Sequence, residues 1–149
     1  MIPTVRSTKR ITAISSITAN PVFVRPWQES DRPFLRTLFL HARREAWPWL
    51  NSEDWQLEDF DAATRDEQIW VAVQNGHRVG FASVLPNDNF LHNLFVGPEY
   101  QGLGVGSVLL EQVQKTFTST GALKCLVKNE RAVAFYQHHG WHIEATGDS

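Results

Sequence analysis

Cysteine is almost absent from this sequence, because Cys125 is the only one among 149 residues. A single cysteine cannot form an intrachain disulfide, which argues against a disulfide-stabilised secreted domain and favours a reducing compartment, here the cytoplasm. Cys125 lies among apolar residues of a predicted strand, so a buried and inert thiol is expected.

Long apolar runs and an excess of charge are also lacking. No apolar stretch approaches the roughly 20 residues of a membrane-spanning helix, and the formal net charge is −2. We therefore expect neither a membrane nor a nucleic acid as partner. No metal site is predicted either: His138, His139 and His142 would point in different directions, and no pair of carboxylates or thiolates accompanies them.

The composition that remains is that of one globular domain, with 42% hydrophobic and 20% charged residues. Residues 1–20 differ, since they are rich in Ser and Thr and contain basic but no acidic side chains. Transit peptides have this composition, but we favour a flexible extension, or an extra strand at residues 11–17. Residues 21–149 form the predicted domain.

Strand and helix patterns follow one another in mixed order along this domain. Asn75-Gly76 between two apolar segments indicates a hairpin, and apolar positions at helical spacing indicate the helices. The expected strands are residues 22–25, 69–73, 78–85, 90–96 and 123–127, with another from Trp141; the expected helices are about 30–46, 104–117 and 132–138, with a loosely helical acidic segment at 53–67. This order favours an α/β sandwich around a central sheet.

The most informative stretch is residues 94–107, where an apolar strand ends at Gly97-Pro98 and a loop with three glycines leads into an amphipathic helix. Glycine lets a ligand approach the backbone closely. The first amides of a helix have no internal acceptor, and the helix dipole is positive there. An anion, most often a phosphate, is the expected occupant.

Two phosphate loops are excluded by Ser107. A P-loop needs a lysine before that position, and a dinucleotide fingerprint needs a glycine there and an acidic residue some twenty positions later. Gln101, Gly104 and Gly106 instead match the pattern Gln/Arg-x-x-Gly-x-Gly/Ala, and here the chain resembles the GNAT superfamily of acetyl-CoA-dependent N-acetyltransferases.

A second segment supports this resemblance. Residues 129–141 are similar to the family pattern Asn-x-x-Ala-x-x-Phe-Tyr-x-x-x-Gly-Phe, with Trp141 in place of the last Phe. The resemblance covers roughly residues 22–145. It implies a three-layer sandwich whose mostly antiparallel sheet splays at the cofactor site, with acetyl-CoA as co-substrate. The cofactor-binding residues that it implies are Leu94, Phe95, Val96, Gln101, Gly102, Leu103, Gly104, Val105, Gly106, Ser107, Asn129, Ala132 and Phe135.

The resemblance also implies catalytic roles. Tyr136 matches the tyrosine that protonates the leaving thiolate, although it could be a packing residue. Strand alternation puts His92 on one face with Leu94 and Val96, where an imidazole with a pKa near ~6.5 could act as general base. The alternative for His92 is a hydrogen-bonded histidine at the sheet edge, and Glu45 and Asp88 are weaker candidates for the base.

The function that follows is transfer of an acetyl group from acetyl-CoA to a primary amine, of a small molecule or a peptide, by direct attack. The alternative is a non-catalytic acyl-CoA-binding or sensor domain. Trp47, Trp49 and Trp55 lie in the family's acceptor region, and most tryptophans are core residues. The acidic residues between positions 53 and 61 indicate a solvated helix face or a surface that attracts an amine.

One departure concerns the end of the domain. The family usually closes with a hairpin of two strands, whereas this sequence stops a few residues past Trp141. We expect the last strand to be missing and residues 141–145 to form an uncovered edge, which favours a homodimer.

Overall fold

The computed structural model describes residues 21–46, 53–124 and 130–142. Residues 1–20, Trp47, Trp49, Cys125, Asn129 and the end of the chain from position 143 lie outside the described residues. The main elements in chain order are β1 (Val22–Pro26), α1 (Arg32–Ala46), α2 (Asp59–Ala63), β2 (Gln68–Gln74), β3 (His77–Leu85), β4 (Phe90–Val96), α3 (Val105–Thr116), β5 (Ala122–Leu123) and α4 (Glu130–His138).

The sheet has the order β1-β2-β3-β4-β5, and only the pairing of β4 with β5 is parallel. The predicted mostly antiparallel sheet is therefore confirmed, together with the hairpin at Asn75-Gly76, where both residues have positive φ. Within the described residues, β5 pairs with β4 only at Phe90 and Leu91. The later part of β4 thus extends beyond this pairing, on the side from which the chain continues into the glycine loop.

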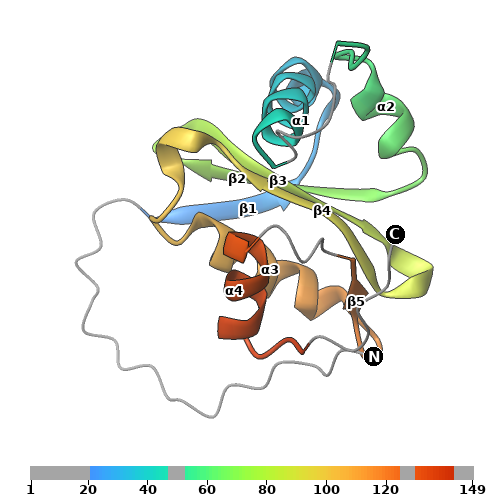
Figure 1. The fold of residues 1–149 in the computed structure, drawn as a ribbon, viewed down its shortest axis with the longest axis vertical. Coiled ribbons are helices and arrows are strands. Elements are labelled where there is room, and N and C mark those ends of the chain that lie inside the picture. The colour runs from blue at the N-terminus through green and yellow to red at the C-terminus, as the bar shows by residue number, and fades with distance from the viewer. Residues whose placement is uncertain (1–20, 47–52, 125–129, 143–149) are drawn as a thin grey trace.

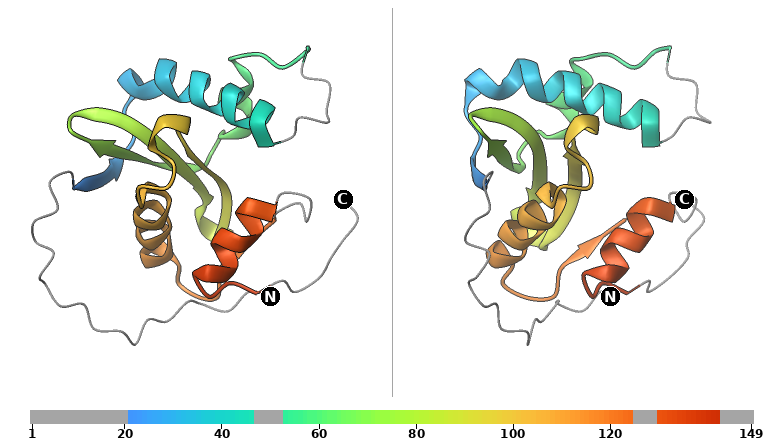
Figure 2. Two further views of the ribbon diagram at one scale, coloured as in Figure 1. Left: turned by 60° about the vertical axis from the view of Figure 1, so that its left-hand side comes forward. Right: turned by 90° about the vertical axis from the view of Figure 1, so that its left-hand side faces the viewer.

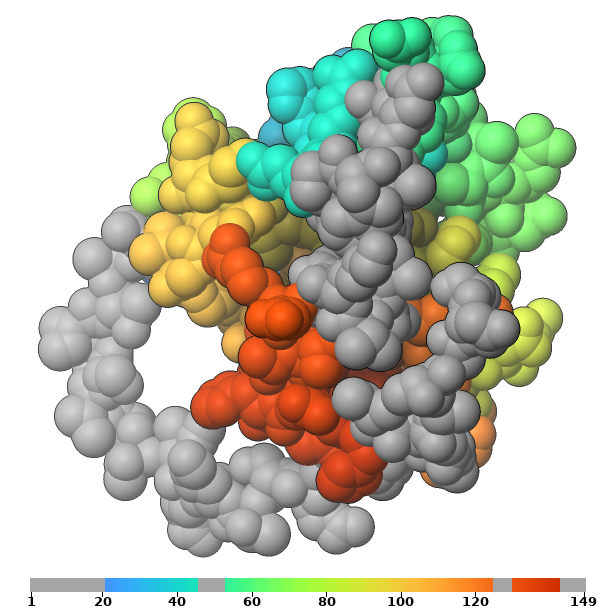
Figure 3. Space-filling model, viewed as in Figure 1, coloured from blue at the N-terminus to red at the C-terminus, as the bar shows by residue number. Residues whose placement is uncertain are grey.

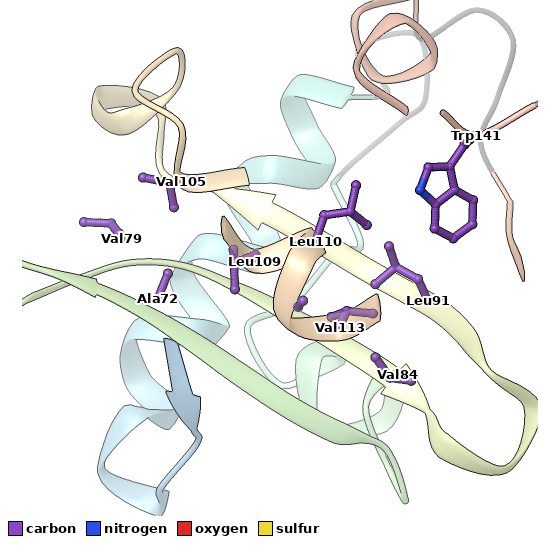
Figure 4. Packing of buried hydrophobic residues seen from close by; sticks show 10 residues of the cluster. Ala72, Val79, Val84, Leu91, Val105, Leu109, Leu110, Val113 and Trp141 are labelled. Carbon is purple, nitrogen blue, oxygen red and sulfur yellow. The ribbon is translucent and has the colours of Figure 1, made fainter. Parts of the chain in front are cut away.

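Helices cover both faces of the sheet and give three layers (Figures 1 and 2). α1 and α2 lie on one face, where Leu35, Phe39 and Phe60 pack with Phe81 of β3 in one buried cluster. α3 and α4 lie on the other face. There the apolar side of α3 packs onto the sheet, as Figure 4 shows for Val105, Leu109, Leu110 and Val113.

The acidic segment before β2 is less helical than expected, because only Asp59–Ala63 forms a helix among its described residues. Its carboxylates do not make a merely solvated face. Asp59 pairs with Arg43 at 2.8 Å, and Asp61 pairs with Arg32 at 2.9 Å and with Arg36 at 2.5 Å. These ion pairs attach α2 to α1.

The strand expected from Trp141 is not present in its first two residues, since Trp141 and His142 belong to no strand. Trp141 is buried in the core beside α3 instead, and its indole Nε1 donates to Gln114 Oε1 at 2.9 Å. The remaining residues of that expected edge, 143–145, lie outside the described residues. β5 is Ala122–Leu123 and Lys124 is not in a strand, while residues 125–127 of the predicted strand lie outside the described residues.

Candidate active site

The loop after β4 is held against the end of the sheet. The Gly97 amide donates to Val79 O at 2.8 Å, and the Tyr100 amide donates to Gly97 O at 2.9 Å, which closes a short 3-10 turn. The Gln101 side chain then reaches back, and its Nε2 donates to Val96 O at 3.2 Å. Gln101 thus ties the glycine loop to the last residue of β4.

The first turn of α3 presents its amides outward from this loop. Gly104 precedes the helix with φ +88°, a left-handed conformation that favours glycine. The first backbone bond runs from the Val108 amide to Gly104 O, so the amides of Val105, Gly106 and Ser107 have no acceptor within the helix. The N-cap residue is Gly104, so it supplies no side-chain cap. The arrangement suits the pyrophosphate of a CoA-type ligand.

Helix α4 lies beside this cradle, and Figure 3 shows its red surface next to the yellow-orange loop. A Cβ added to Gly106 would lie 3.3 Å from the Phe135 ring, so glycine permits this close approach. Ser107 Oγ lies 2.9 Å from His139 Nε2, and Arg131 Nη2 donates to Gln101 Oε1 at 3.5 Å. Burial, and then the neighbouring His138, lower the pKa of His139.

Tyr136 lies between two aromatic rings. Its ring centroid is 5.1 Å from that of Phe135 and 6.1 Å from that of Trp141, both with edge-to-face geometry. The Tyr136 carbonyl accepts a hydrogen bond from the Trp141 amide at 2.9 Å. These contacts hold the side chain in place, half-buried against the α3 core.

The predicted alternation along β4 is wrong at His92. The register between β3 and β4 pairs Ser83 with Asn93 but Val84 with Leu91, which leaves His92 as the extra residue of a β-bulge. Leu94 and Val96 pack in the α3 core, whereas His92 contacts Glu67 beside α2, on the opposite face. A bulge re-aims side chains and breaks the period of two, so His92 does not share a face with Leu94 and Val96.

The partner of His92 is a carboxylate that sequence reasoning missed. His92 Nδ1 lies 2.5 Å from Glu67 Oε2, with the Glu67 side chain 4% exposed and the imidazole 41% exposed. The hydrogen bond with Glu67 raises the pKa of His92, and burial opposes this effect. The two residues are 25 positions apart, and Glu67 lies at the end of an acidic segment, so no local pattern connects them.

Asn129 lies outside the described residues, and the other predicted cofactor residues belong to β4, the loop that follows it, the start of α3, and α4. The loop from Gln101 to Ser107 meets Phe135 of α4, as described above, and Ala132 of the same helix is half-buried. The side chains of Leu94 and Val96 pack in one core and that of Phe95 in the other, so this strand can offer a ligand mainly its backbone. Leu103 is 60% exposed at the tip of the loop.

His92 lies four residues before Val96, which is about 13 Å along an extended strand. A ligand that contacts both the amides of α3 and the neighbourhood of His92 must therefore be elongated. The weaker base candidates, Glu45 on α1 and Asp88 before β4, are both exposed, whereas the carboxylate that contacts His92 is that of Glu67.

Two further properties follow from the described residues. None of their His, Cys, Asp and Glu side chains form a group of three that could hold a metal ion. Among the same residues, every helix is too short or too polar to cross a membrane.

Comparisons with known proteins agree with this geometry. Residues 25–141 match the Acetyltransferase (GNAT) family. The peptidyl-lysine N-acetyltransferase YiaC of Escherichia coli is 30% identical over 125 residues, which are 80% of this chain and 83% of that protein. A ribosomal-protein alanine N-acetyltransferase of Escherichia coli is 30% identical over 115 residues, 72% of each chain. The crystal structure of the PaiA N-acetyltransferase of Thermoplasma acidophilum in complex with coenzyme A superposes with a TM-score of 0.72 at 19% identity, covering 87% of this chain and 94% of the other. The protein therefore belongs to the GNAT family of acetyltransferases.

Proposed function

We propose that this acetyltransferase moves an acetyl group from acetyl-CoA to a primary amine by direct attack. The observation that carries the proposal is the start of α3, where left-handed Gly104 leaves three backbone amides free for a pyrophosphate beside the end of β4. The Phe135 ring lies close to Gly106. Because Tyr136 is the next residue of α4, it lies on the same side of the molecule as the start of α3. The coenzyme A complex of the PaiA relative supports a CoA-type ligand.

Acetyl-CoA would supply the acetyl group as a thioester, and the chain would hold it and move protons. The amides of residues 105–107 bind the pyrophosphate, and the backbone of β4 near Phe95 and Val96 orients the acyl end. His92 takes one proton from the substrate ammonium, after which the amine nitrogen bonds to the acetyl carbon and the carbon–sulfur bond breaks. Tyr136 protonates the departing sulfur and recovers a proton from the nitrogen. The proton on His92 passes to solvent.

The acceptor class is an exposed primary amine of a peptide or a small molecule. The names of the relatives, a peptidyl-lysine and a ribosomal-protein alanine N-acetyltransferase, support a peptide amine. His92 is 41% exposed and beside the α2 side of the sheet, which leaves it accessible to a group carried on a larger substrate. The acceptor wall would include Trp55, whose ring lies 4.5 Å from the Arg43 guanidinium carbon.

The experiment has two parts. Calorimetry with acetyl-CoA tests the ligand, and thiol release over a panel of lysine peptides, amino-terminal peptides, polyamines and aminoglycosides tests the reaction. We expect saturable binding and turnover with at least one amine class. Absence of binding to the intact chain contradicts the proposal. Binding without turnover on any amine indicates the alternative, an acyl-CoA-binding or sensor domain.

A further inference from the structure

Glu67 occupies a position that the backbone around it specifies. α2 ends at Ala63, and the next residue, Thr64, donates from both its amide and its hydroxyl to Phe60 O. The Glu67 amide then donates to Thr64 O at 3.0 Å. Between them Asp66 adopts φ +64°, a conformation that Asp tolerates better than most residues. This tight turn places Glu67 directly before β2, where its side chain contacts His92 in the bulge of β4.

The Glu67 carboxylate is buried, unlike the carboxylate of an ordinary surface ion pair. Its side chain is 4% exposed, Oε2 contacts His92, and Oε1 has no hydrogen-bond partner among the described residues. Removing a carboxylate from water costs free energy unless it is paired. The only side-chain contact described for this buried carboxylate is with the half-exposed imidazole of His92. We therefore look for the role of Glu67 in what it does to that imidazole.

The contact with a carboxylate favours one tautomer of His92. A carboxylate accepts hydrogen bonds, so neutral His92 must carry its proton on Nδ1 to donate to Glu67 Oε2. The other ring nitrogen, Nε2, then holds the lone pair and can accept a proton. The bulge turns this ring away from the α3 core, where Leu94 and Val96 lie.

We propose that Glu67 is a positioning residue that holds His92 with Nδ1 protonated, so that Nε2 takes the proton of the acceptor amine. This inference rests on the proposed function and adds a residue to it. In the step itself, the amine nitrogen loses a proton to Nε2, the resulting imidazolium stays paired with the Glu67 carboxylate, and the proton then leaves to solvent. Glu67 accepts the hydrogen bond from Nδ1 throughout and touches no substrate.

The pH dependence that follows has a defined sign. The imidazole faces the Glu67 carboxylate, the Ala63 carbonyl at the end of α2 and the Phe90 ring of β4. Of these three, only Glu67 is ionisable, and its hydrogen bond is the largest cause that raises the pKa of His92. Replacing the carboxylate by a neutral amide should therefore lower that pKa, and His92 should lose its proton at a lower pH.

The first test needs no activity. Long-range proton–nitrogen NMR spectra of the full chain, recorded across pH, report the tautomer and titration of each of its six histidines, and His92→Gln assigns the His92 signals. We expect neutral His92 to carry its proton on Nδ1, and Glu67→Gln to move its midpoint to lower pH. Glu67→Asp, which keeps the charge, should restore part of the shift. Asp66→Asn is the matched control, because it removes the adjacent exposed carboxylate and should leave the midpoint unchanged.

The second test uses the reaction. With Glu67→Gln, we expect the acidic limb of kcat/KM to move to lower pH while the alkaline plateau falls by roughly tenfold or more. A uniform loss with an unmoved limb, or an Nε2–H tautomer of neutral His92 in the wild type, overturns the inference and leaves Glu67 a structural residue. Turnover with no effect of Glu67→Gln overturns this inference alone, whereas no turnover on any amine overturns the proposed function as well.

Discussion

Removing the Tyr136 hydroxyl tests whether this residue acts in catalysis or only in aromatic packing. Its ring packs edge-to-face against Phe135 and Trp141. Tyr136→Phe keeps this ring, so we expect the variant to keep the aromatic packing and the acetyl-CoA affinity. If the hydroxyl protonates the leaving thiolate, kcat should fall roughly 10²-fold or more.

Thiol-release kinetics together with calorimetry measure the two quantities for this variant. Tyr100→Phe is the matched control, since Tyr100 is the only other tyrosine of the chain and lies in the short turn before the loop. An unchanged kcat for Tyr136→Phe would assign the residue to aromatic packing.

The buried side chain of Asp31 should make the free energy of unfolding depend on pH. Its side chain is fully buried and accepts hydrogen bonds from Arg25 at 2.8 Å and Arg78 at 2.6 Å. The bond from Arg25, then those from Arg78 and the Gln28 amide, hold the pKa of Asp31 well below its ordinary value, against the opposing effect of burial. A depressed pKa stabilises the fold above the unfolded-state value near ~3.9, and this contribution is lost as pH falls towards the folded-state value.

Asp31→Asn should therefore lower the free energy of unfolding at pH 7 by roughly 2–3 kcal/mol, since it leaves two partly exposed arginines without their buried partner. Urea unfolding at pH 7 and at successively lower pH measures this cost, and we expect it to shrink below pH ~4. Asp88→Asn, at an exposed carboxylate, should cost no more than about 0.5 kcal/mol. A cost for Asp31→Asn that is independent of pH would contradict the ion-pair explanation.

The start of α3 is the element on which ligand binding depends. Gly104 and Gly76 both have positive φ, and a Cβ at either position would meet nothing within 4 Å. Aspartate at either site should therefore strain the backbone to a similar extent. Only Gly104→Asp also places a carboxylate beside the free amides that would bind a pyrophosphate.

We expect Gly104→Asp to abolish measurable acetyl-CoA binding in calorimetry, while Gly76→Asp in the β2–β3 hairpin binds as the wild type does. Gly106→Asp should also weaken binding, and in addition disturb Phe135, which a Cβ at that position would crowd. Equal losses for Gly104→Asp and Gly76→Asp would mean that strain alone accounts for the effect.

At the scale of the whole molecule, a homodimer stays a prediction. The open edge expected at residues 141–145 is not a strand in its first two residues. The described residues do leave one edge open at β1, which pairs only with β2 and carries Phe23, 66% exposed. Unpaired edges favour association with another chain.

Light scattering on the 149-residue chain should thus give twice the mass of 17.0 kDa. Phe23→Lys adds a charge to the β1 edge, and we expect it to weaken the dimer if that edge forms the interface. A wild-type chain that stays monomeric at high concentration contradicts the prediction.

The sequence alone predicts several elements of this protein, because short-range patterns specify them. The hairpin at Asn75-Gly76, the strand that became β4 and the glycine loop that begins α3 each depend on residues within a few positions of one another. Turn geometry, apolar periodicity and helix starts are short-range properties. The paired motifs around Gly104 and Phe135 were therefore visible before the structure, and the family comparisons agree with them.

Only the tertiary structure decided where His92 points and what holds it. The bulge that turns His92 to the α2 face arises from the register between β3 and β4, which no residue of β4 encodes by itself. Glu67 meets His92 across 25 positions because α2 and its terminal turn bring the carboxylate under that strand. The ion pairs of Asp59 and Asp61 with α1 depend on the same packing. Such contacts form only when separate elements dock, because pairing register and burial are properties of the assembled sheet and helices.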